Sequence, residues 1–507
     1  MSEGRPGPGN DRIDAGCLPE WSRADLPEPP PFNLRNALKM IGPGIIAMGL
    51  ALGAGEWLFG PVVTVRYQGR LMFVVLLVIF FQAVLNTECI RYTLYSGEPI
   101  FSGYMRLKPG SRFWGAFFIG IDVGTNFWPG LALTAATALA ALYLGAMPTA
   151  ADKDLVTVLA VGVLLLAASV ILFGGKVYNS VERAMKVLVS LVFLYLLFIA
   201  VTMIEGATWK KIALGTVDVT SIFELAGGEE FLIVGAFVAY AGLGGFGNAT
   251  ISNYVRDKGW GMGSRVGAIP SAVGGIDLKL SHVGTVFPPT ESNLQRWRDW
   301  WRYVRLDQYA VWAFGSFLGM LLPSVIALQF IEPGSAVSEW GAAAVQAEGI
   351  ARVAGPVFWY LTILCGFFVL FSSQIGGIEI LPRRWSDLLW TGFPRFRDLD
   401  ERWIRRVYYS VVGLYLVWCL IIAGLQLDSP LYIAALMANL RLFPIIPTFV
   451  LTVVVNRRFL PAELKPPLWR EIVMLVAAVC YSALLIATLF LDSRGAGRKL
   501  LEVLGLW

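Results

Sequence analysis

The sequence predicts an all-α integral membrane protein of about eleven transmembrane helices, two of them broken. Of its 507 residues, 56% are hydrophobic and 15% are charged, whereas a soluble protein is roughly 45–50% apolar and about 25% charged. The apolar residues form long segments, and about 20 residues are enough for a helix to cross a bilayer. Glycine clusters at Gly53–Gly55 and Gly242–Gly247 interrupt two of these segments.

The chain divides into a tail, a membrane domain and a second tail. Residues 1–37 are polar and rich in proline, so we expect a disordered cytoplasmic tail. The membrane domain covers about 38–495, and 496–507 form a C-terminal tail. The expected spanning segments lie near 40–64, 70–94, 113–144, 154–174, 183–204, 229–255, 308–330, 353–378, 405–426, 430–455 and 470–491.

The first segment combines flexible backbone with a charge. Glycine costs helix stability, so the helix is expected to unwind at Gly53, Ala54 and Gly55. Unwound backbone at membrane depth is tolerated only where it lines a cavity or is buried in protein. Glu56 follows directly, and an ionisable residue within a span is a functional-site candidate by default. The alternative is a packing face of small residues with a hydrogen-bonded acid.

The sixth segment repeats this interruption. Four glycines between Ala241 and Asn248 disfavour a continuous helix, which adds Ala241, Gly242 and Gly244 to the expected binding site. Two interrupted segments at corresponding positions indicate two inverted repeats, with a site between the breaks near the middle of the membrane. Two unrelated packing helices remain the alternative.

The repeats and the orientation follow from this arrangement. The first repeat covers about 40–204, the second about 229–455, and an extra helix about 470–491. Most of the 41 Lys and Arg residues fall in alternate loops, which places the N-terminus inside and the C-terminus outside an inner membrane. The aromatic and basic run within the loop from Arg256 to Arg305 suits a helix at headgroup level rather than a nucleic-acid surface.

Four short motifs follow one another along the chain, at Gly42–Gly44, Cys89–Gly97, Lys176–Lys186 and Arg441–Pro461. In the order of these motifs, and in length and helix count over about 40–490, the chain resembles the Nramp family of divalent-metal transporters. The resemblance implies a LeuT-type fold of two five-helix repeats, with the metal bound between the two breaks.

The sequence departs from the family at the metal site. The first break of the family reads Asp-Pro-Gly-Asn, and its Asp and Asn ligate the metal, whereas Gly53 and Glu56 occupy these positions here. The second break of the family reads Met-Pro-His, but Gly242–Gly244 contains neither residue. Pro129 and Ala132 stand where the family carries acids in the third helix. The residues therefore do not support a site for soft metals.

Four further polar residues within spans are candidates for the site. Asp122 and Asn126 share one helical face, and Asp122 is either a proton-relay acid or a packing residue. Asn439 and Arg441 lie on the tenth segment, where the family offers a polar side chain to the site. A lone arginine in the membrane needs a partner, and we expect Arg441 to lie close to Glu56, which would favour an organic solute. The alternative is that the two lie apart, which would leave Glu56 available as an anionic ligand for a metal.

Other polar residues are expected to be structural. Glu88 and Glu379 lie near the inner ends of their spans, where Arg91 and Arg383 can pair with them. The five cysteines show no metal-ligand spacing, and the single histidine, His282, lies in a loop. The sequence therefore indicates no disulfide framework, no histidine cluster and no cofactor.

The predicted function is transport rather than catalysis. The resemblance implies a divalent cation moved by alternating access, with or without proton coupling. Glu56 is the candidate metal ligand and, with Asp122, the candidate relay acid; oxygen ligands favour a hard ion such as Mg²⁺ or Mn²⁺. The alternatives are a transporter of a small organic or zwitterionic solute and a non-transporting sensor or scaffold. The expected partners are the lipid bilayer and a small substrate, without nucleic acid, and a monomer is compatible with the sequence.

Overall fold

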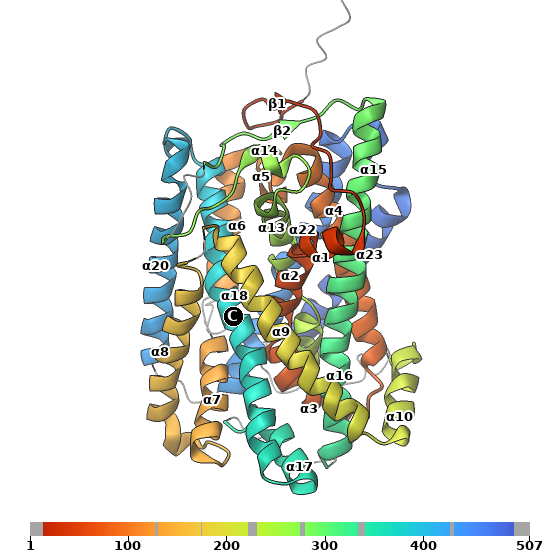
Figure 1. Cartoon of the computed structure of the whole chain (residues 1–507), viewed down its shortest axis with the longest axis vertical. Helices are drawn as coiled ribbons and strands as arrows, with labels where there is room; N and C mark the ends of the chain where they lie inside the picture. The colour runs from red at the N-terminus through yellow and green to blue at the C-terminus, as the bar shows by residue number, and fades with distance from the viewer. Residues whose placement is uncertain are drawn as a thin grey trace, which may run out of the picture.

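The computed structural model describes residues 14–126, 130–173, 175–221, 231–273, 279–332, 340–425 and 430–490. Helices along the long axis form one bundle (Figure 1). The first elements are β1 (Ser22–Arg23), α1 (Leu34–Met40), α2 (Pro43–Ala51), the π-helix η1 (Gly55–Phe59), α3 (Gly60–Arg66), α4 (Met72–Ser96), α5 (Ile100–Met105), α6 (Ser111–Thr125), α7 (Gly130–Leu144), η2 (Ala150–Asp152), α8 (Lys153–Val170), α9 (Val177–Thr202) and α10 (Gly206–Val217).

The remaining elements follow in the same bundle. They are α12 (Phe231–Tyr240), α13 (Gly247–Lys258), α14 (Gly263–Val266), β2 (Thr285–Val286), α15 (Glu291–Arg305), the π-helix η3 (Leu306–Ala313), α16 (Phe314–Phe330), α17 (Val345–Ala354), α18 (Val357–Gly392), α19 (Pro394–Arg397), η4 (Glu401–Trp403), α20 (Ile404–Gly424), α21 (Pro430–Leu440), α22 (Leu442–Phe459), η5 (Ala462–Leu464) and α23 (Leu468–Phe490).

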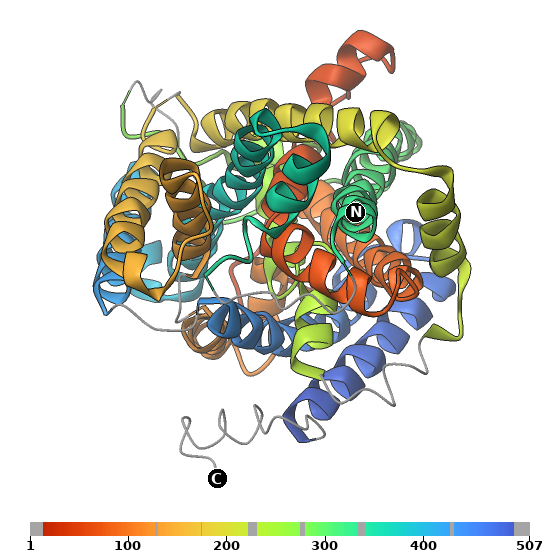
Figure 2. The ribbon, with the colours of Figure 1, turned by 90° about the horizontal axis from the view of Figure 1, so that it is seen from below.

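The helices are long and apolar enough for a multi-pass membrane protein. Within the described residues, eight helices can cross a membrane by length and composition, or up to nine if the bent pair around the first break counts as one span. Shorter apolar helices lie in α7 and α12. Each of the eleven predicted segments overlaps one or more of these helices. Seen from below, the broken first helix and α18 lie within the bundle, while α8 and α23 lie at its periphery (Figure 2).

The Gly-Pro-Gly motif fixes the start of the first helix. The backbone N–H groups of Gly42 and Gly44 donate hydrogen bonds to the two carboxylate oxygens of Asp307, at 3.0 and 2.7 Å. A side chain at Gly44 would collide with Asp307, so the motif permits the close approach. Asp307 satisfies N–H groups that the first turn of α2 cannot bond internally, and thereby ties α2 to η3.

Both predicted helix breaks are confirmed. The first helix ends at Ala51, Leu52 is extended, and the segment that starts at Gly55 is bent by 44° from α2. The second break separates α12 from α13, and Gly242, Gly244 and Gly245 adopt φ values of 101°, 61° and 53°. Such left-handed backbone is open to glycine at little cost, which explains the cluster.

The third segment, predicted as one helix over 113–144, is two helices instead. The first, α6, ends at Thr125, and Asn126 has the non-helical φ of −123°. The next helix begins at Gly130. The physical reason lies in the sequence, because Pro129 cannot donate a backbone hydrogen bond within a helix.

The prediction of a disordered tail is wrong for residues 14–37. Trp21 and Leu26 are buried, and β1 pairs in parallel with β2. The guanidinium of Arg106 donates hydrogen bonds to the carbonyl oxygens of Ala15 and Pro19 and lies 4.0 Å from the Trp21 ring centroid. These contacts hold the segment against the rest of the protein, although its composition alone suggests disorder. Residues 1–13 and the predicted tail 496–507 lie outside the described residues.

Candidate solute-binding site

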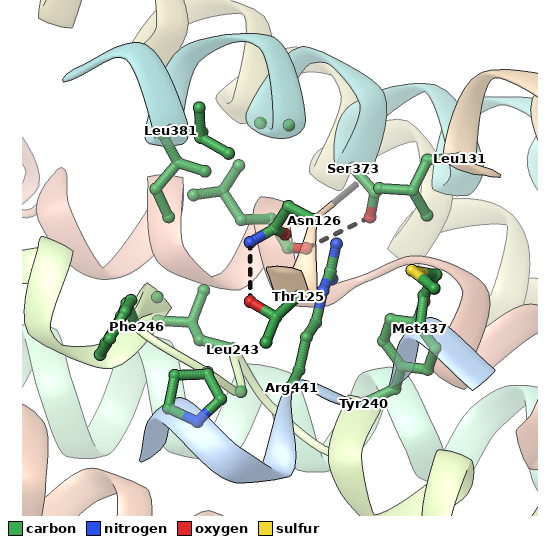
Figure 3. Close-up of a pocket in the computed structure, with 18 of the residues that line it drawn as sticks. Thr125, Asn126, Leu131, Tyr240, Leu243, Phe246, Ser373, Leu381, Met437 and Arg441 are labelled. Carbon is green, nitrogen blue, oxygen red and sulfur yellow. Dashed lines mark hydrogen bonds between the residues drawn. The ribbon is translucent and has the colours of Figure 1, made fainter. Parts of the chain in front are cut away.

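A cavity of about 90 Å³ lies beside the second break. Its wall is formed by α2, α6, α7, the end of α12, the second break, α18, α20 and the junction of α21 with α22. Figure 3 shows side chains around it. Its polar lining residues are Thr125, Asn126, Tyr240, Ser373, Gln374, Arg384, Tyr415 and Arg441. The site thus combines side chains from both predicted repeats.

A single glutamine on α4 holds the second break in shape. The side-chain amide of Gln82 donates a hydrogen bond to the carbonyl oxygen of Ala241 at 2.8 Å, and its oxygen accepts one from the N–H of Leu243 at 3.0 Å. The same amide donates to the hydroxyl of Tyr481 on α23 at 3.0 Å. Gln82 is fully buried, so these bonds replace those that the interrupted helix cannot make.

Two serines of α18 perform the same role at the first break. The hydroxyl of Ser373 donates to the carbonyl oxygens of Leu52 and Leu50, at 2.8 and 3.2 Å. Ser372 adds a hydrogen bond to Leu52 at 3.2 Å. A side chain at Gly53 would collide with the Ser373 hydroxyl. Glycine is therefore required at Gly53 for packing, whatever else the position does.

Glu56 belongs to the first break but does not line the cavity described above. Its side chain is fully buried, and its Oε2 accepts a hydrogen bond from the N–H of Gly53 at 2.8 Å. Its Oε1 has no hydrogen-bond partner among the described residues. Gly319 of α16 packs against its side chain, since a Cβ there would lie 3.8 Å from Glu56 Cγ. The carboxyl group therefore caps its own helix break.

Two arginines line the cavity, and they differ in their partners. Arg384 forms a bidentate ion pair with Asp122, with both N···O distances at 2.6 Å, and a further hydrogen bond to Thr250 at 2.8 Å. Asp122 is buried and also accepts hydrogen bonds from Trp385 and Asn126. This arginine is therefore neutralised by a fixed acid.

The side chain of Arg441 makes no hydrogen bond or ion pair with any residue that the structure describes. Its guanidinium carbon lies 5.6 Å from the centroid of the Tyr240 ring, and its Nε is buried without a partner. Figure 3 shows the side chain extending into the space between Tyr240 and Ser373. The residue is partly buried, and its cation lacks the counter-charge that stabilises a guanidinium away from water.

The predicted pairing of Glu56 with Arg441 is wrong. No N···O distance between them falls within 4.0 Å in the described structure, and the two side chains reach different places. Tyr240 fills the space near both, because its Cβ packs against Gly55 and its ring faces Arg441. The expected pairs of Glu88 with Arg91 and of Glu379 with Arg383 are confirmed.

The predicted site residues are divided between the cavity and the framework around it. Gly244 and Arg441 line the cavity. Ala241 and Gly242 contact Gln82 behind the second break. Outside the cavity wall also lie Gly53, Ala54, Glu56, Asp122 and Asn439. Asn439 faces α12 instead, where its amide donates to the carbonyl oxygen of Leu232 at 2.7 Å.

Sequence reasoning missed two residues that shape the site. Gln82 lies within an apolar segment, and its position there was the available signal, because a buried amide must find partners. Arg384 follows Arg383 and reads as part of the same basic end of α18. On α18, however, the side chain of Arg384 faces Asp122. The separation of the two residues along the chain gives no sign of this contact.

Comparisons with known proteins show a shared fold. No family model matches the sequence, and no curated protein matches it. Among solved structures, a variant of the Eremococcus coleocola manganese transporter matches with 16% identity and a TM-score of 0.58, covering 96% of each chain. The same transporter with a bound aromatic bis-isothiourea compound matches with 16% identity and a TM-score of 0.55, covering 98% of this chain and 97% of that one.

Identity at this level establishes the fold rather than the cargo. The all-α fold expected from the Nramp resemblance, of LeuT type with the first and sixth spans broken, is confirmed. The chain is a multi-pass membrane protein with the fold of the manganese transporter, and its cavity has a different set of polar residues from the one the resemblance implies.

Proposed function

We propose that the chain is a divergent Nramp-like secondary transporter that moves a small organic solute with a negative charge by alternating access. The observation that carries this proposal is the unpaired guanidinium of Arg441 in the cavity. No carboxylate lines the described part of the wall. A divalent cation in this space is repelled by Arg441, whereas an organic anion supplies the missing partner.

The fold supports transport over a static role. The cavity lies beside the second helix break, where three glycines adopt positive φ values. In transporters of this architecture, the half-helix ends around such breaks bind solutes. A scaffold that had lost transport would fill the site with side chains, but about 90 Å³ stays open. The bias of Lys and Arg toward alternate loops supports the proposed orientation, with the N-terminus in the cytoplasm and the C-terminus outside.

The test is a ligand screen on the purified full-length chain. Thermal unfolding is followed with organic anions, organic cations, MgCl₂ and MnCl₂, and stabilising compounds are then assayed for uptake into proteoliposomes. We expect stabilisation and uptake by organic anions, both lost in Arg441→Gln. Stabilisation by divalent metals alone would contradict the proposal, and so would anion uptake that is equal in the wild type and the variant.

The second candidate function is transport of a divalent cation. The shared fold with the manganese transporter favours it. Metal would then depend on the free carboxylate oxygen of Glu56, and Asp122 would serve proton coupling. Groups of three or more His, Cys, Asp or Glu that could hold a metal are absent from the described residues. Without Met or His at the break, Cd²⁺ should bind no better than Mg²⁺, which isothermal titration calorimetry measures.

A further inference from the structure

The charges and size of the cavity narrow the class of solute. We propose that the cargo is a short-chain monocarboxylate, of about two to four carbons, whose carboxylate pairs with Arg441. This inference rests on the proposed function and names the substrate of the same site. Its support comes from three independent properties of the cavity, namely its cation, its lack of further fixed charge and its volume.

The receptor for the carboxylate is built around Arg441. The planar guanidinium presents paired donors that match a carboxylate, and the Tyr240 ring at 5.6 Å helps to hold its orientation. The second break lies close to Arg441, because a Cβ placed on Gly245 would lie 3.6 Å from the Cβ of Arg441. The twelve-residue helix α13 starts at Gly247 on the same wall. Its N-terminal dipole adds to the attraction for an anion.

The described wall offers no free charge to a second ionised group on the solute. Arg384, its other charged residue, is neutralised by Asp122 behind the wall at 2.6 Å. A dicarboxylate would leave its second charge without a free cation, and the ammonium of an amino acid would find no free carboxylate among the described lining residues. An uncompensated buried charge is costly. The best match is therefore a solute with one negative charge.

The size and surface of the cavity limit the rest of the solute. A volume of about 90 Å³ is smaller than the cavity of about 150 Å³ that accommodates benzene in an engineered protein. Apolar side chains line the space beside the arginine, among them Leu131, Leu243 and Met437. A chain of a few methylene groups fits this surface, whereas an aromatic acid is too large.

The experiment measures binding of acetate, propionate and butyrate to the purified full-length chain by isothermal titration calorimetry, with benzoate, succinate, glycine and MnCl₂ as comparison ligands. We expect propionate or butyrate to bind at least about tenfold more tightly than the four comparison ligands, equivalent to about 1.4 kcal/mol. Arg441→Gln should weaken propionate binding by a further factor of about ten or more. Arg112→Gln, an exposed arginine at the start of α6, is the matched control and should bind as the wild type does.

Two additional variants keep the test decisive if Arg441→Gln does not fold. Arg441→Lys retains the charge but loses the paired donors, so it should bind propionate about tenfold more weakly. Met437→Ala enlarges the cavity and should shift the preference toward longer chains.

The outcomes separate this inference from the proposed function. Arg441-dependent binding of succinate or glycine, at least as tight as that of propionate, overturns the monocarboxylate class and leaves the organic-anion transporter standing. Manganese binding without binding of any carboxylate overturns both. A chain-length preference that Met437→Ala leaves unchanged overturns the assignment of this cavity as the binding site.

Discussion

The N–H of Gly53 donates a hydrogen bond to the carboxylate of Glu56, three residues later, at 2.8 Å. The broken helix leaves this donor without a backbone partner, and the acid of the same span supplies one. Glu56 is fully buried and packs against α16. Glu56, the candidate metal ligand in the sequence analysis, therefore stabilises the backbone beside the site.

The first prediction concerns this cap. Glu56→Gln keeps an oxygen that can accept the hydrogen bond, so we expect a stability close to that of the wild type. Glu56→Ala leaves the Gly53 N–H unsatisfied, at a cost of about 1–3 kcal/mol. Thermal unfolding measures both, with the exposed Glu463→Ala as control. Equal loss of stability in the Gln and Ala variants would show that the negative charge, rather than the acceptor, is required.

The second prediction concerns the glutamine behind the second break. Gln82→Leu removes hydrogen bonds to both Ala241 and Leu243, so residues 241–246 should exchange amide hydrogen faster and solute should bind more weakly. Tyr481→Phe removes only one partner of Gln82 and should have a smaller effect in the same direction. Hydrogen exchange measured by mass spectrometry compares Gln82→Leu and Tyr481→Phe with the wild type, with Ser482→Ala as control. Unchanged exchange in Gln82→Leu would contradict the role.

The limits of prediction from sequence are clear at these residues. Glycine clusters predict both breaks because backbone with positive φ at Gly242 and Gly244 is accessible to glycine. The direction of the Glu56 side chain could not be predicted, since a residue at a break can face the cavity or the neighbouring helix. The contact of Gln82 with Leu243 joins residues 161 positions apart. Composition also led to a wrong prediction of disorder for residues 14–37. Contacts with distant parts of the chain, rather than the local sequence, order this segment.

The third prediction concerns pH and the ion pair between Glu98 and Arg106, which holds the segment that contains Trp21. Glu98 lies in the loop after α4 and forms an ion pair with Arg106 at 2.5 Å. Burial raises the pKa of Glu98, but Arg106 and hydrogen bonds from Tyr92 and the Gly284 N–H outweigh this effect, so its pKa lies below the ordinary value. A carboxyl group whose pKa is lowered in the folded state stabilises the protein above its unfolded pKa, and this stability is lost as the pH falls through the folded pKa.

The measurement is the melting temperature between about pH 3 and 7. The wild type should lose stability on acidification, and Glu98→Gln should be less stable at neutral pH with a flatter acid limb. A Glu98→Gln profile parallel to that of the wild type would show that other carboxyl groups account for the acid sensitivity.

The fourth prediction concerns the neutralised arginine. Asp122→Asn leaves Arg384 without its counter-ion, and breaking a buried pair in this way costs about 3–5 kcal/mol. Asp122→Asn combined with Arg384→Gln should recover much of this loss, because no unpaired charge remains. Thermal unfolding of the two single variants and the double variant forms the cycle. A stable Asp122→Asn variant whose uptake loses its pH dependence would instead support Asp122 as a proton relay.

The most direct test of the central claim reverses the charge of the cavity. Arg441→Glu replaces the unpaired cation with an anion, so the variant should bind Mn²⁺ and lose propionate, whereas the wild type should bind propionate and leave Mn²⁺ free. Isothermal titration calorimetry of both proteins with both ligands gives the four dissociation constants to compare. Manganese binding by the wild type that Arg441→Glu does not strengthen would contradict an anionic cargo held by Arg441.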